Sequence, residues 1–462
     1  MRNLRVLFCV SEVAPYAKTG GLADVAQALP VALWHLGCDV RLFMPLYRCA
    51  RDSIKTFSIL PAPPTISVGV HDYHVGLLET RSTSGLPLYL LEKEEFYDRS
   101  DLYGTPDFGD YEDNPERFIT FSLAIRSLCM GLNWFPSILH LHDWQTGLAA
   151  AYHHFYWRHE PDFANSRTVF TIHNLAYQGV FPGKYFHLTN LPWEAFSLQG
   201  VEFWGNCNFL KAGLVYSDHL TTVSPCYGKE IQDSEHGCGL HGVLQERKDR
   251  LSGILNGIDQ AVWNPGTDSC IAANYNSSRL EGKRRCKDAL LAEFGFSKDR
   301  SELPLLGMIS RMAVQKGFGL FLDIVDELVN LPLMLVILGA GDAEIGRMVQ
   351  TVAARYPNNI RICNEFNEHL AHRIEAGADM FLMPSVYEPC GLNQMYSLRY
   401  GTIPIVHATG GLNDSVVDVQ LEPHSGTGFK FYHYNADGLL DTIKAALSFF
   451  KDKGEWTALQ RR

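Results

Sequence analysis

Residues 5–44 read RVLFCVSEVAPYAKTGGLADVAQALPVALWHLGCDVRLFM. An apolar run at Arg5–Val10 is followed by helix-like spacing of apolar residues over Ala23–Leu36 and by a second apolar run at Asp39–Met44. A strand, a helix and a strand in this order are typical of a βαβ unit, whose two strands lie parallel in one sheet. Residues 5–44 therefore predict the start of an α/β domain.

The same alternation continues along the chain and then restarts after a polar stretch at residues 266–300. Continuous apolar strands separated by helices indicate parallel sheets that are covered on both faces. The restart predicts two doubly wound domains, with a boundary near Asn256–Pro265 and a ligand cleft at the carboxyl ends of the strands. The further strands predicted are residues 138–141, 168–172, 219–223, 252–255, 305–309, 333–338, 359–363, 380–383 and 403–406.

Composition excludes several classes of protein. The 462 residues are 46% hydrophobic and 20% charged, which is enough apolar material for two or three cores. With 40 Lys and Arg against 51 Asp and Glu, the net charge of −11 argues against nucleic-acid and anionic-membrane partners. The 11 cysteines contain no Cys-x-x-Cys pair, so neither a disulfide framework nor a zinc ribbon is expected. We expect a soluble, cytoplasmic protein.

The first strand leads into a glycine pair that opens a helix. Lys18 precedes Gly20 and Gly21, and Asp24 follows them. Backbone N–H groups at such a turn approach an anion closely, and a lysine adds a point charge. The spacing fits neither a Walker loop nor a dinucleotide fingerprint. A plain strand–helix turn with a solvated lysine remains the alternative from these residues alone.

Two histidines, His140 and His142, lie two residues apart at the end of the strand at 138–141. Period two places both on one face, which allows a metal site, but no third ligand is near in sequence and a structural role is favoured. Asp143 at the carboxyl end of this strand is the better functional candidate. His173 follows the next strand and has the same two interpretations, functional or structural.

In the second domain, Arg311 and Lys316 follow the strand at 305–309. Two cations five residues apart at a strand end are suited to clamping a diphosphate, while two solvated side chains are the simpler alternative. Glu388 precedes Pro389, and we expect a helix to begin just beyond it, with the N–H groups of Cys390 and Gly391 free to meet phosphate or sugar hydroxyls. An acidic capping residue is the alternative for Glu388.

A further small-residue turn, Thr409-Gly410-Gly411, follows the strand at 403–406. Together these motifs resemble the bacterial glycogen synthase and plant starch synthase family, which are retaining glucosyltransferases of the GT-B fold. The motifs appear in family order over essentially the whole chain. The matching segments are Lys18–Val25, His142–Trp144, His173–Gly179, Leu255–Asp259, Ser310–Arg311 with Gln315–Gly317, Glu388–Leu392 and Thr409–Leu412.

The resemblance implies two Rossmann-like domains facing a central cleft. Residues 1–255 would form the acceptor side and residues 256–436 the nucleotide-sugar side. Residues 437–462 would be a helical segment returning toward the first domain, shortened here relative to the family. The implied reaction transfers glucose from ADP-glucose to the non-reducing end of an α-1,4-glucan (glycogen, starch or a malto-oligosaccharide) with retention of configuration, releasing ADP. A mature plant enzyme would work in the plastid stroma.

The resemblance also implies roles for individual residues. Arg311 and Lys316 would neutralise the leaving diphosphate, and Lys18 with the backbone of Gly20 and Gly21 would complete that cradle. Glu388 would hold the donor glucose hydroxyls, with the amides of Cys390 and Gly391 beside it. His173 would face the reacting sugar, Phe366 would lie against the adenine ring, and Thr409-Gly410-Gly411 would complete the pocket. Weaker candidates near the sugar or acceptor are Asp24, Tyr103, Asp143 and Asn256.

Because Arg311 and Lys316 can offset the charge of the departing ADP, no metal or other cofactor is expected. Position 396 is Tyr, where many related retaining transferases have a second Glu, and this favours the synthase family over its relatives. Two alternatives remain. One is a retaining transferase that uses UDP-glucose, and the other is a non-catalytic glucan-binding relative, against which the intact Lys18, His173, Arg311, Lys316 and Glu388 argue.

Overall fold

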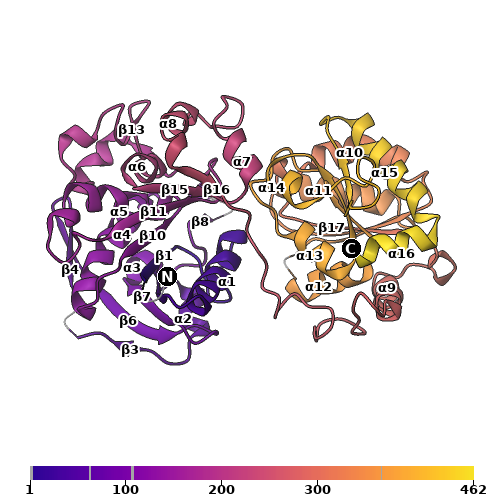
Figure 1. The fold of residues 1–462 in the computed structure, drawn as a ribbon, viewed down its shortest axis with the longest axis horizontal. Coiled ribbons are helices and arrows are strands. Elements are labelled where there is room, and N and C mark those ends of the chain that lie inside the picture. Colours follow the sequence, from indigo (N-terminus) through magenta and orange to yellow (C-terminus); the bar gives the residue numbers. More distant parts are fainter. Residues whose placement is uncertain (1–3, 62–63, 106–108, 366) are drawn as a thin grey trace. The chain divides into compact units, whose positions relative to one another are not determined.

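The computed structural model describes residues 4–61, 64–105, 109–365 and 367–462. Residue contacts divide the chain into two compact units, Met1–Ile254 and Leu255–Arg462 (Figure 1). This division lies one residue from the one expected after residue 255. Of the helices in the described ranges, none combines the length and apolar content needed to cross a bilayer.

The first unit is built on a nine-stranded sheet with the order β16-β15-β11-β10-β1-β2-β7-β6-β3. The six strands β7, β2, β1, β10, β11 and β15 are parallel neighbours, which is the 3-2-1-4-5-6 order of a Rossmann-like sheet. The strands are β1 Arg5–Cys9, β2 Asp39–Pro45, β3 Ser58–Ile59, β6 Gly76–Arg81, β7 Pro87–Glu92, β10 Ile138–His142, β11 Arg167–Ile172, β15 His219–Thr222 and β16 Leu251–Gly253.

One part of this sheet departs from the expectation of parallel strands. β6 pairs antiparallel with both β7 and β3, so the sheet is mixed. β6 and β7 form a hairpin in which the backbone N–H of Ser82 donates to the carbonyl of Leu86 and the N–H of Leu86 donates to the Ser82 hydroxyl. A hairpin needs only a short turn where a parallel pair needs a crossover, and this turn sets the direction of β6.

Helices cover the first sheet and short strands surround it (Figure 1). The helices are α1 Gly21–His35, α2 Arg48–Ser53, α3 Glu94–Tyr97, α4 Asn114–Leu132, α5 Trp144–Phe155, α6 Phe209–Tyr216, α7 Pro225–Glu230 and α8 His241–Glu246. The short strands outside the main sheet are β4 Thr65–Val68, β5 His71–His74, β8 Gly104–Thr105, β9 Gly109–Asp110, β12 Val180–Pro182, β13 Glu202–Phe203 and β14 Asn206–Asn208.

The second unit contains a six-stranded, fully parallel sheet with the order β19-β18-β17-β20-β21-β22. This too is the 3-2-1-4-5-6 order. The strands are β17 Leu305–Ile309, β18 Met334–Leu338, β19 Ile360–Cys363, β20 Met380–Met383, β21 Ile403–His407 and β22 Phe429–Phe431. The helices are α9 Glu281–Glu293, α10 Phe318–Leu328, α11 Ala343–Arg355, α12 Glu368–Gly377, α13 Asn393–Tyr400, α14 Gly410–Ser415, α15 Ala436–Phe450 and α16 Lys453–Arg461.

Alternate residues of one strand enter the two cores of this unit. Leu335 and Ile337 of β18 pack in the cluster shared with α10, α11 and α15, whereas Val336 and Leu338 pack in the cluster shared with α9 and α12. Figure 1 shows these two groups of helices on opposite sides of β17. Both faces of the strand are therefore buried, which explains its continuous apolar sequence.

For two segments of the second unit, the sequence predicted no bounds of individual helices. The polar stretch at 266–300 contains α9, whose Leu290 and Leu291 are buried against β17 and β18. Residues 437–462 form most of α15 and all of α16, and their contacts group them with the second unit, where Trp456 and Leu459 join the main core cluster. These last helices therefore bury their apolar faces within that unit.

Candidate functional site

The first set of candidate residues lies where the second sheet reverses its strand order. β17 and β20 are adjacent, and the connections after them run in opposite directions along the sheet, which is where α/β proteins bind ligands. The loop after β17 carries Arg311 and Lys316, and the loop after β20 carries Glu388. The fold thus brings together residues that are 72 positions apart in the chain.

Lys316 and Glu388 form an ion pair at this position, with 2.6 Å between Nζ and Oε2. Two hydrogen bonds join the same loops, from the Val386 N–H to the Gln315 carbonyl (2.9 Å) and from Gln315 Nε2 to the Tyr387 carbonyl (3.2 Å). The Glu388 side chain is 6% exposed and that of Lys316 is 19% exposed. A buried carboxylate beside a partly open ammonium group gives this loop pair both signs of charge within reach of a ligand.

A second group holds the Glu388 carboxylate in place. Ser385 Oγ donates to Glu388 Oε2 at 3.0 Å, and the Ser385 carbonyl is 2.8 Å from His407 Nδ1. With Oε2 accepting from both Lys316 and Ser385, the carboxylate is fixed before any ligand arrives. Such preorganisation is what a group that must orient a sugar requires.

The expected helix start just beyond Pro389 is wrong. Helix α13 begins at Asn393, and Gly391 has φ of +71°, outside the helical region. The amides of Cys390 and Gly391 therefore precede the helix and do not form its first turn. The Glu388 carbonyl instead accepts the N–H of Gly411, at the start of the short helix α14.

Close backbone contact explains the glycines in these loops. Gly317 has φ of +75°, and a Cβ there would lie 1.7 Å from the Pro384 carbonyl oxygen. A Cβ at Gly411 would lie 2.1 Å from the Cys390 carbonyl oxygen. Only glycine lets the three loops after β17, β20 and β21 approach this closely, so Thr409-Gly410-Gly411 does lie beside the Glu388 loop.

Asn256 and Cys390 also meet in this unit. Burial raises the pKa of the Cys390 thiol to about 12, and hydrogen bonding from Asn256 opposes the rise. The thiol is protonated at neutral pH, so it is not a nucleophile. Arg311 is exposed, two residues after the end of β17. The expectation for Phe366 falls on a residue outside the described part of the chain.

The second set of candidate residues lies at the equivalent reversal of the first sheet, between β1 and β10. After β1, Lys18 Nζ pairs with Asp24 Oδ1 at 2.7 Å, across the Gly20-Gly21 turn. The N–H and hydroxyl of Thr19 both donate to Glu12 (2.6 and 2.7 Å). The loop that carries Lys18 is thus tied down by a carboxylate.

Tyr103 also belongs to this hydrogen-bonded group after β1. Its hydroxyl lies 2.8 Å from Glu12 Oε1 and 2.7 Å from Ser11 Oγ. Burial raises the pKa of Glu12, and the hydrogen bonds from Thr19 and Tyr103 work against that rise. Ser11 and Glu12 were not selected as candidates from the sequence. Both follow closely after β1, and an acidic residue at the carboxyl end of a parallel strand could have indicated a functional position.

Asp143 and His173 are brought together at the ends of β10 and β11. Asp143 Oδ1 accepts the backbone N–H of His173 at 2.7 Å. Asp143 has φ of +54° and ψ of −173°, a region that non-glycine residues rarely adopt and that typically costs ~1–3 kcal/mol. Burial raises its pKa to about 7, and the N–H groups of His173 and Asn174 oppose the rise. Backbone strain and a shifted pKa are both common at functional sites, which makes Asp143 a candidate residue.

His142 orients His173. Nδ1 of His142 is 2.9 Å from Nε2 of His173, and His140 Nε2 is 2.8 Å from the Thr171 hydroxyl. Burial lowers the pKa of His173 to about 3 and that of His140 to about 4, so both rings are neutral at pH 7. These partners favour the structural interpretation of the His140–His142 pair, and among the described residues of this unit no group of three metal donors is found.

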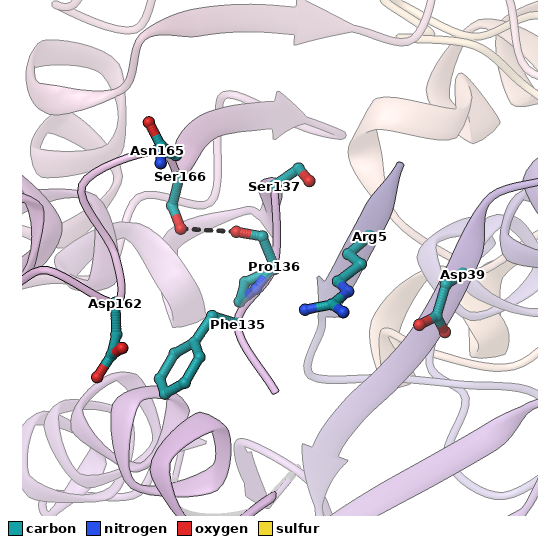
Figure 2. A pocket seen from close by; sticks show the side chains of 8 residues that line it. All are labelled: Arg5, Asp39, Phe135, Pro136, Ser137, Asp162, Asn165 and Ser166. Carbon is teal, nitrogen blue, oxygen red and sulfur yellow. Dashed lines mark hydrogen bonds between the residues drawn. The ribbon is translucent and has the colours of Figure 1, made fainter. Parts of the chain in front are cut away.

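A pocket of about 600 Å³ opens at the other edge of the first sheet (Figure 2). It lies at the amino ends of β1, β2, β10 and β11, and Figure 2 shows the Ser166 hydroxyl bonded to the Pro136 carbonyl in its wall. None of the candidate residues lines this pocket. It is lined by Arg5, Asp39, Phe135, Pro136, Ser137, Asp162, Asn165 and Ser166.

Two Rossmann-like units, each with its polar residues at the carboxyl ends of the strands, define the class: a two-domain glycosyltransferase of the GT-B fold. Residues 5–246 match the family described as starch synthase catalytic domain, and residues 292–453 match glycosyl transferases group 1. The chain belongs to the glycogen synthase and starch synthase family of glycosyltransferases.

Individual relatives align with this chain over almost its full length. The chain is 44% identical to a glycogen synthase of Koribacter versatilis, with 99% of this chain and 93% of the relative covered. It is 43% identical to glycogen synthase 2 of Geobacter sulfurreducens, covering 99% and 94%. The catalytic domain of starch synthase IV from Arabidopsis thaliana, bound to ADP and acarbose, superimposes with a TM-score of 0.93 at 31% identity, covering 99% and 94%.

Proposed function

We propose that this enzyme transfers glucose from ADP-glucose to the non-reducing end of an α-1,4-glucan, with retention of configuration and release of ADP. The ion pair between Lys316 and Glu388 at the strand reversal of the second sheet carries the proposal. It offers a fixed ammonium group for a diphosphate and a fixed carboxylate for sugar hydroxyls. The relative crystallised with ADP and acarbose supports a nucleotide and a glucan-like ligand.

The cationic side chains are suited to stabilising the cleavage of the glycosyl–phosphate bond. Cleavage of a glycosyl phosphate leaves positive charge on the sugar and an extra negative charge on ADP. Arg311 and Lys316 would stabilise the departing diphosphate, and one such fixed donor is typically worth ~10²–10³ in rate. Lys18, beside the Gly20-Gly21 turn, would add to this charge. With these cations in place we propose that the reaction needs no metal or other cofactor.

The residues around the sugar divide between orientation and charge. Glu388 would accept the donor glucose hydroxyls, with Cys390, Gly391 and the Thr409–Gly411 turn closing that pocket. Neutral His173, held by His142 and Asp143, would present an uncharged ring to the developing positive charge on the sugar. A neutral imidazole does not repel the positive charge on the sugar, whereas a protonated one would. Asp24, Asn256, Phe366 and Tyr103 are proposed to complete the donor and acceptor subsites.

The test is nucleotide release from ADP-glucose and from UDP-glucose, each with and without a glycogen primer. Glycogen-dependent ADP release with little UDP release is the expected result. Equal or greater UDP release would replace the donor in the proposal, and no release from either would favour a glucan-binding protein without activity. The anomeric configuration of the new linkage, read by NMR of the product, tests retention separately. The bacterial relatives favour the cytoplasm as the compartment.

A further inference from the structure

Four side chains with metal-binding donor atoms gather beside the first turn of α12, outside the loops that carry Arg311, Lys316 and Glu388. Two of them, His369 and His372, are three positions apart on α12 and so share one face of the helix. The other two, Asp268 and Cys270, lie in the segment before α9. About one hundred residues separate the two pairs in the chain, so the fold itself brings them together.

Three of the four donor atoms lie close enough together for a single ion, and the fourth, on His369, contacts one of them. Cys270 Sγ is 3.1 Å from His369 Nδ1, and Asp268 Oδ2 is 2.8 Å from His372 Nδ1. The donor atoms of Asp268, Cys270 and His372 all lie within 4.8 Å of one another. In a tetrahedral zinc site with bonds of about 2.0–2.3 Å, neighbouring donors are separated by roughly 3.3–3.7 Å. Asp268, Cys270 and His372 need side-chain shifts of about an ångström to reach this spacing, and the exposed His369 side chain would have to rotate toward them from its contact with Cys270.

Neighbouring groups hold two of the four donors rigidly. Tyr400 donates to Asp268 Oδ2 at 2.6 Å, and the backbone N–H of Cys270 donates to Asp268 Oδ1 at 2.8 Å. The His372 ring stacks on Trp263, with centroids 3.9 Å apart and planes 6° from parallel. The ion would replace the present contact between Asp268 Oδ2 and His372 Nδ1, while Tyr400 and Trp263 keep the two side chains in place.

Burial is graded across the cluster. Asp268 and His372 are buried at 7% and 5% exposure, Cys270 is half-buried and His369 is exposed. An ion from solvent would therefore meet His369 and Cys270 first and then the two buried donors. The buried donors, Asp268 and His372, are held in place, while Cys270 and His369 are open to solvent and leave an entry path for the ion.

We propose that Asp268, Cys270, His369 and His372 bind one divalent ion of the zinc class. A thiolate and two imidazoles suit zinc and its transition-metal neighbours, whereas magnesium and calcium take oxygen ligands. On binding, the Cys270 thiol loses its proton to solvent and forms the metal–sulfur bond, with no change of oxidation state. The ion would tie the segment before α9 to the start of α12, a structural role separate from the transfer reaction and independent of the proposed function.

The test uses the full chain, freed of metal with a chelator and titrated with Co²⁺. A 1:1 complex with a sulfur-to-cobalt charge-transfer band in the near ultraviolet, displaced by Zn²⁺, is the expected result. Cys270→Ser should abolish that band, and His369→Gln should weaken Co²⁺ binding by at least about tenfold, since even outer partners of metal sites are worth roughly 10–100-fold. Cys363→Ser, at another half-buried cysteine of this unit, is the control and should keep the band.

Two results of this titration would overturn the proposal. The first is a wild-type chain that shows no 1:1 binding. The second is a charge-transfer band that survives Cys270→Ser, because the thiolate would then come from another residue. A thermal unfolding midpoint measured with and without Zn²⁺ gives an independent readout, since an ion bound only by the folded state raises it. Wild type should show the rise and His369→Gln should lose most of it, and an equal rise in both would also contradict the site.

Discussion

The two units use the same strand order, and each places its candidate residues at the reversal of that order, yet the chemistry there differs. The first unit holds buried carboxylates, Glu12 and Asp143, and the neutral ring of His173, with a partly exposed Lys18–Asp24 ion pair beside them. The second unit holds the Lys316–Glu388 ion pair, and Arg311 lies in the same loop as Lys316. The topology fixes where a ligand binds, and the loops decide which charge it meets.

The difference predicts a division of labour. Cations at the second reversal are suited to a diphosphate, while uncharged histidines and hydrogen-bonded carboxylates at the first are suited to sugar hydroxyls. Substitutions in the second unit should therefore damage the handling of the nucleotide and the rate, and those in the first should show their effects through protonation and stability. Four measurements can break or sharpen this comparison.

The largest effect is expected at Glu388. Glu388→Gln keeps the size of the side chain but removes the charge that pairs with Lys316, and we expect kcat to fall by about 10²–10³-fold. The measurement is ADP release at saturating ADP-glucose and glycogen. Glu327→Gln, on the exposed side of α10, is the matched control and should leave the rate unchanged. A Glu388→Gln enzyme with near-wild-type kcat and an unchanged unfolding midpoint would contradict the role given to this carboxylate.

Lys316 should come next. Lys316→Ala removes one cation from the proposed diphosphate site, and we expect kcat/KM for ADP-glucose to fall by about 10²-fold. Lys444→Ala, at an exposed lysine of α15, is the control. Because Lys316 and Glu388 touch, the double variant should lose less than the sum of the two single losses in free energy. Strict additivity would show that the two residues act separately.

The loop contact that supports this pair can be tested through stability. Gly317→Ala places a Cβ 1.7 Å from the Pro384 carbonyl at a φ of +75°, so the loops after β17 and β20 must separate. We expect a loss of about 2–4 kcal/mol in unfolding free energy. Gly295→Ala has a similar φ of +69° but meets no atom within 4 Å, and should cost only about 1–2 kcal/mol. Equal losses in denaturant titrations would show that the close approach is unimportant.

Much of the architecture could be predicted from the sequence, because buried parallel strands carry continuous apolar runs. The strands at 305–309 and 380–383 were predicted to the residue, and two doubly wound sheets were predicted from the alternation of strands and helices, without the strand order that places each reversal. The hairpin β6–β7 was missed, since its direction depends on the Ser82–Leu86 turn and not on apolar periodicity. The start of α13 was misplaced because Pro389 is a strong local signal that the Gly391 conformation overrides.

Candidate site residues could be predicted where a charged residue or a glycine follows a strand. Contacts between side chains that are far apart in the sequence could not. Lys18, Arg311, Lys316 and Glu388 each follow a predicted strand. That Glu12 meets Tyr103, or that His142 meets His173, depends on side chains 91 and 31 positions apart, which a single sequence does not relate. Tyr396, noted only as a replaced glutamate, stacks on Trp263 at 3.8 Å, so a carboxylate there would lose a packed aromatic contact.

The last measurement tests the first unit through pH, where the change expected per pH unit is small. The pKa of Asp143 is raised by burial to about 7, well above its ordinary value of 3.8, so between about pH 4 and 7 the folded chain binds more protons than the unfolded chain. Its contribution to stability is therefore complete below pH 4 and is lost as pH rises toward 7. Asp143→Asn keeps an acceptor for the His173 N–H and removes this loss. The free energy of unfolding of the variant should rise relative to wild type by at most about 1.4 kcal/mol per pH unit across that range.

Denaturant titrations of both proteins from pH 4 to 8 measure this slope, with exposed Asp162→Asn as the control. The buried histidines act in the opposite direction, since their lowered pKa values make wild-type stability rise from about pH 4 to 6.5. Because both chains contain these histidines, their contribution cancels in the difference and Asp143 alone remains. A difference that stays flat with pH would mean that this carboxylate is ionised in the folded state, and the first reversal would then carry a buried charge much as the second does at Glu388.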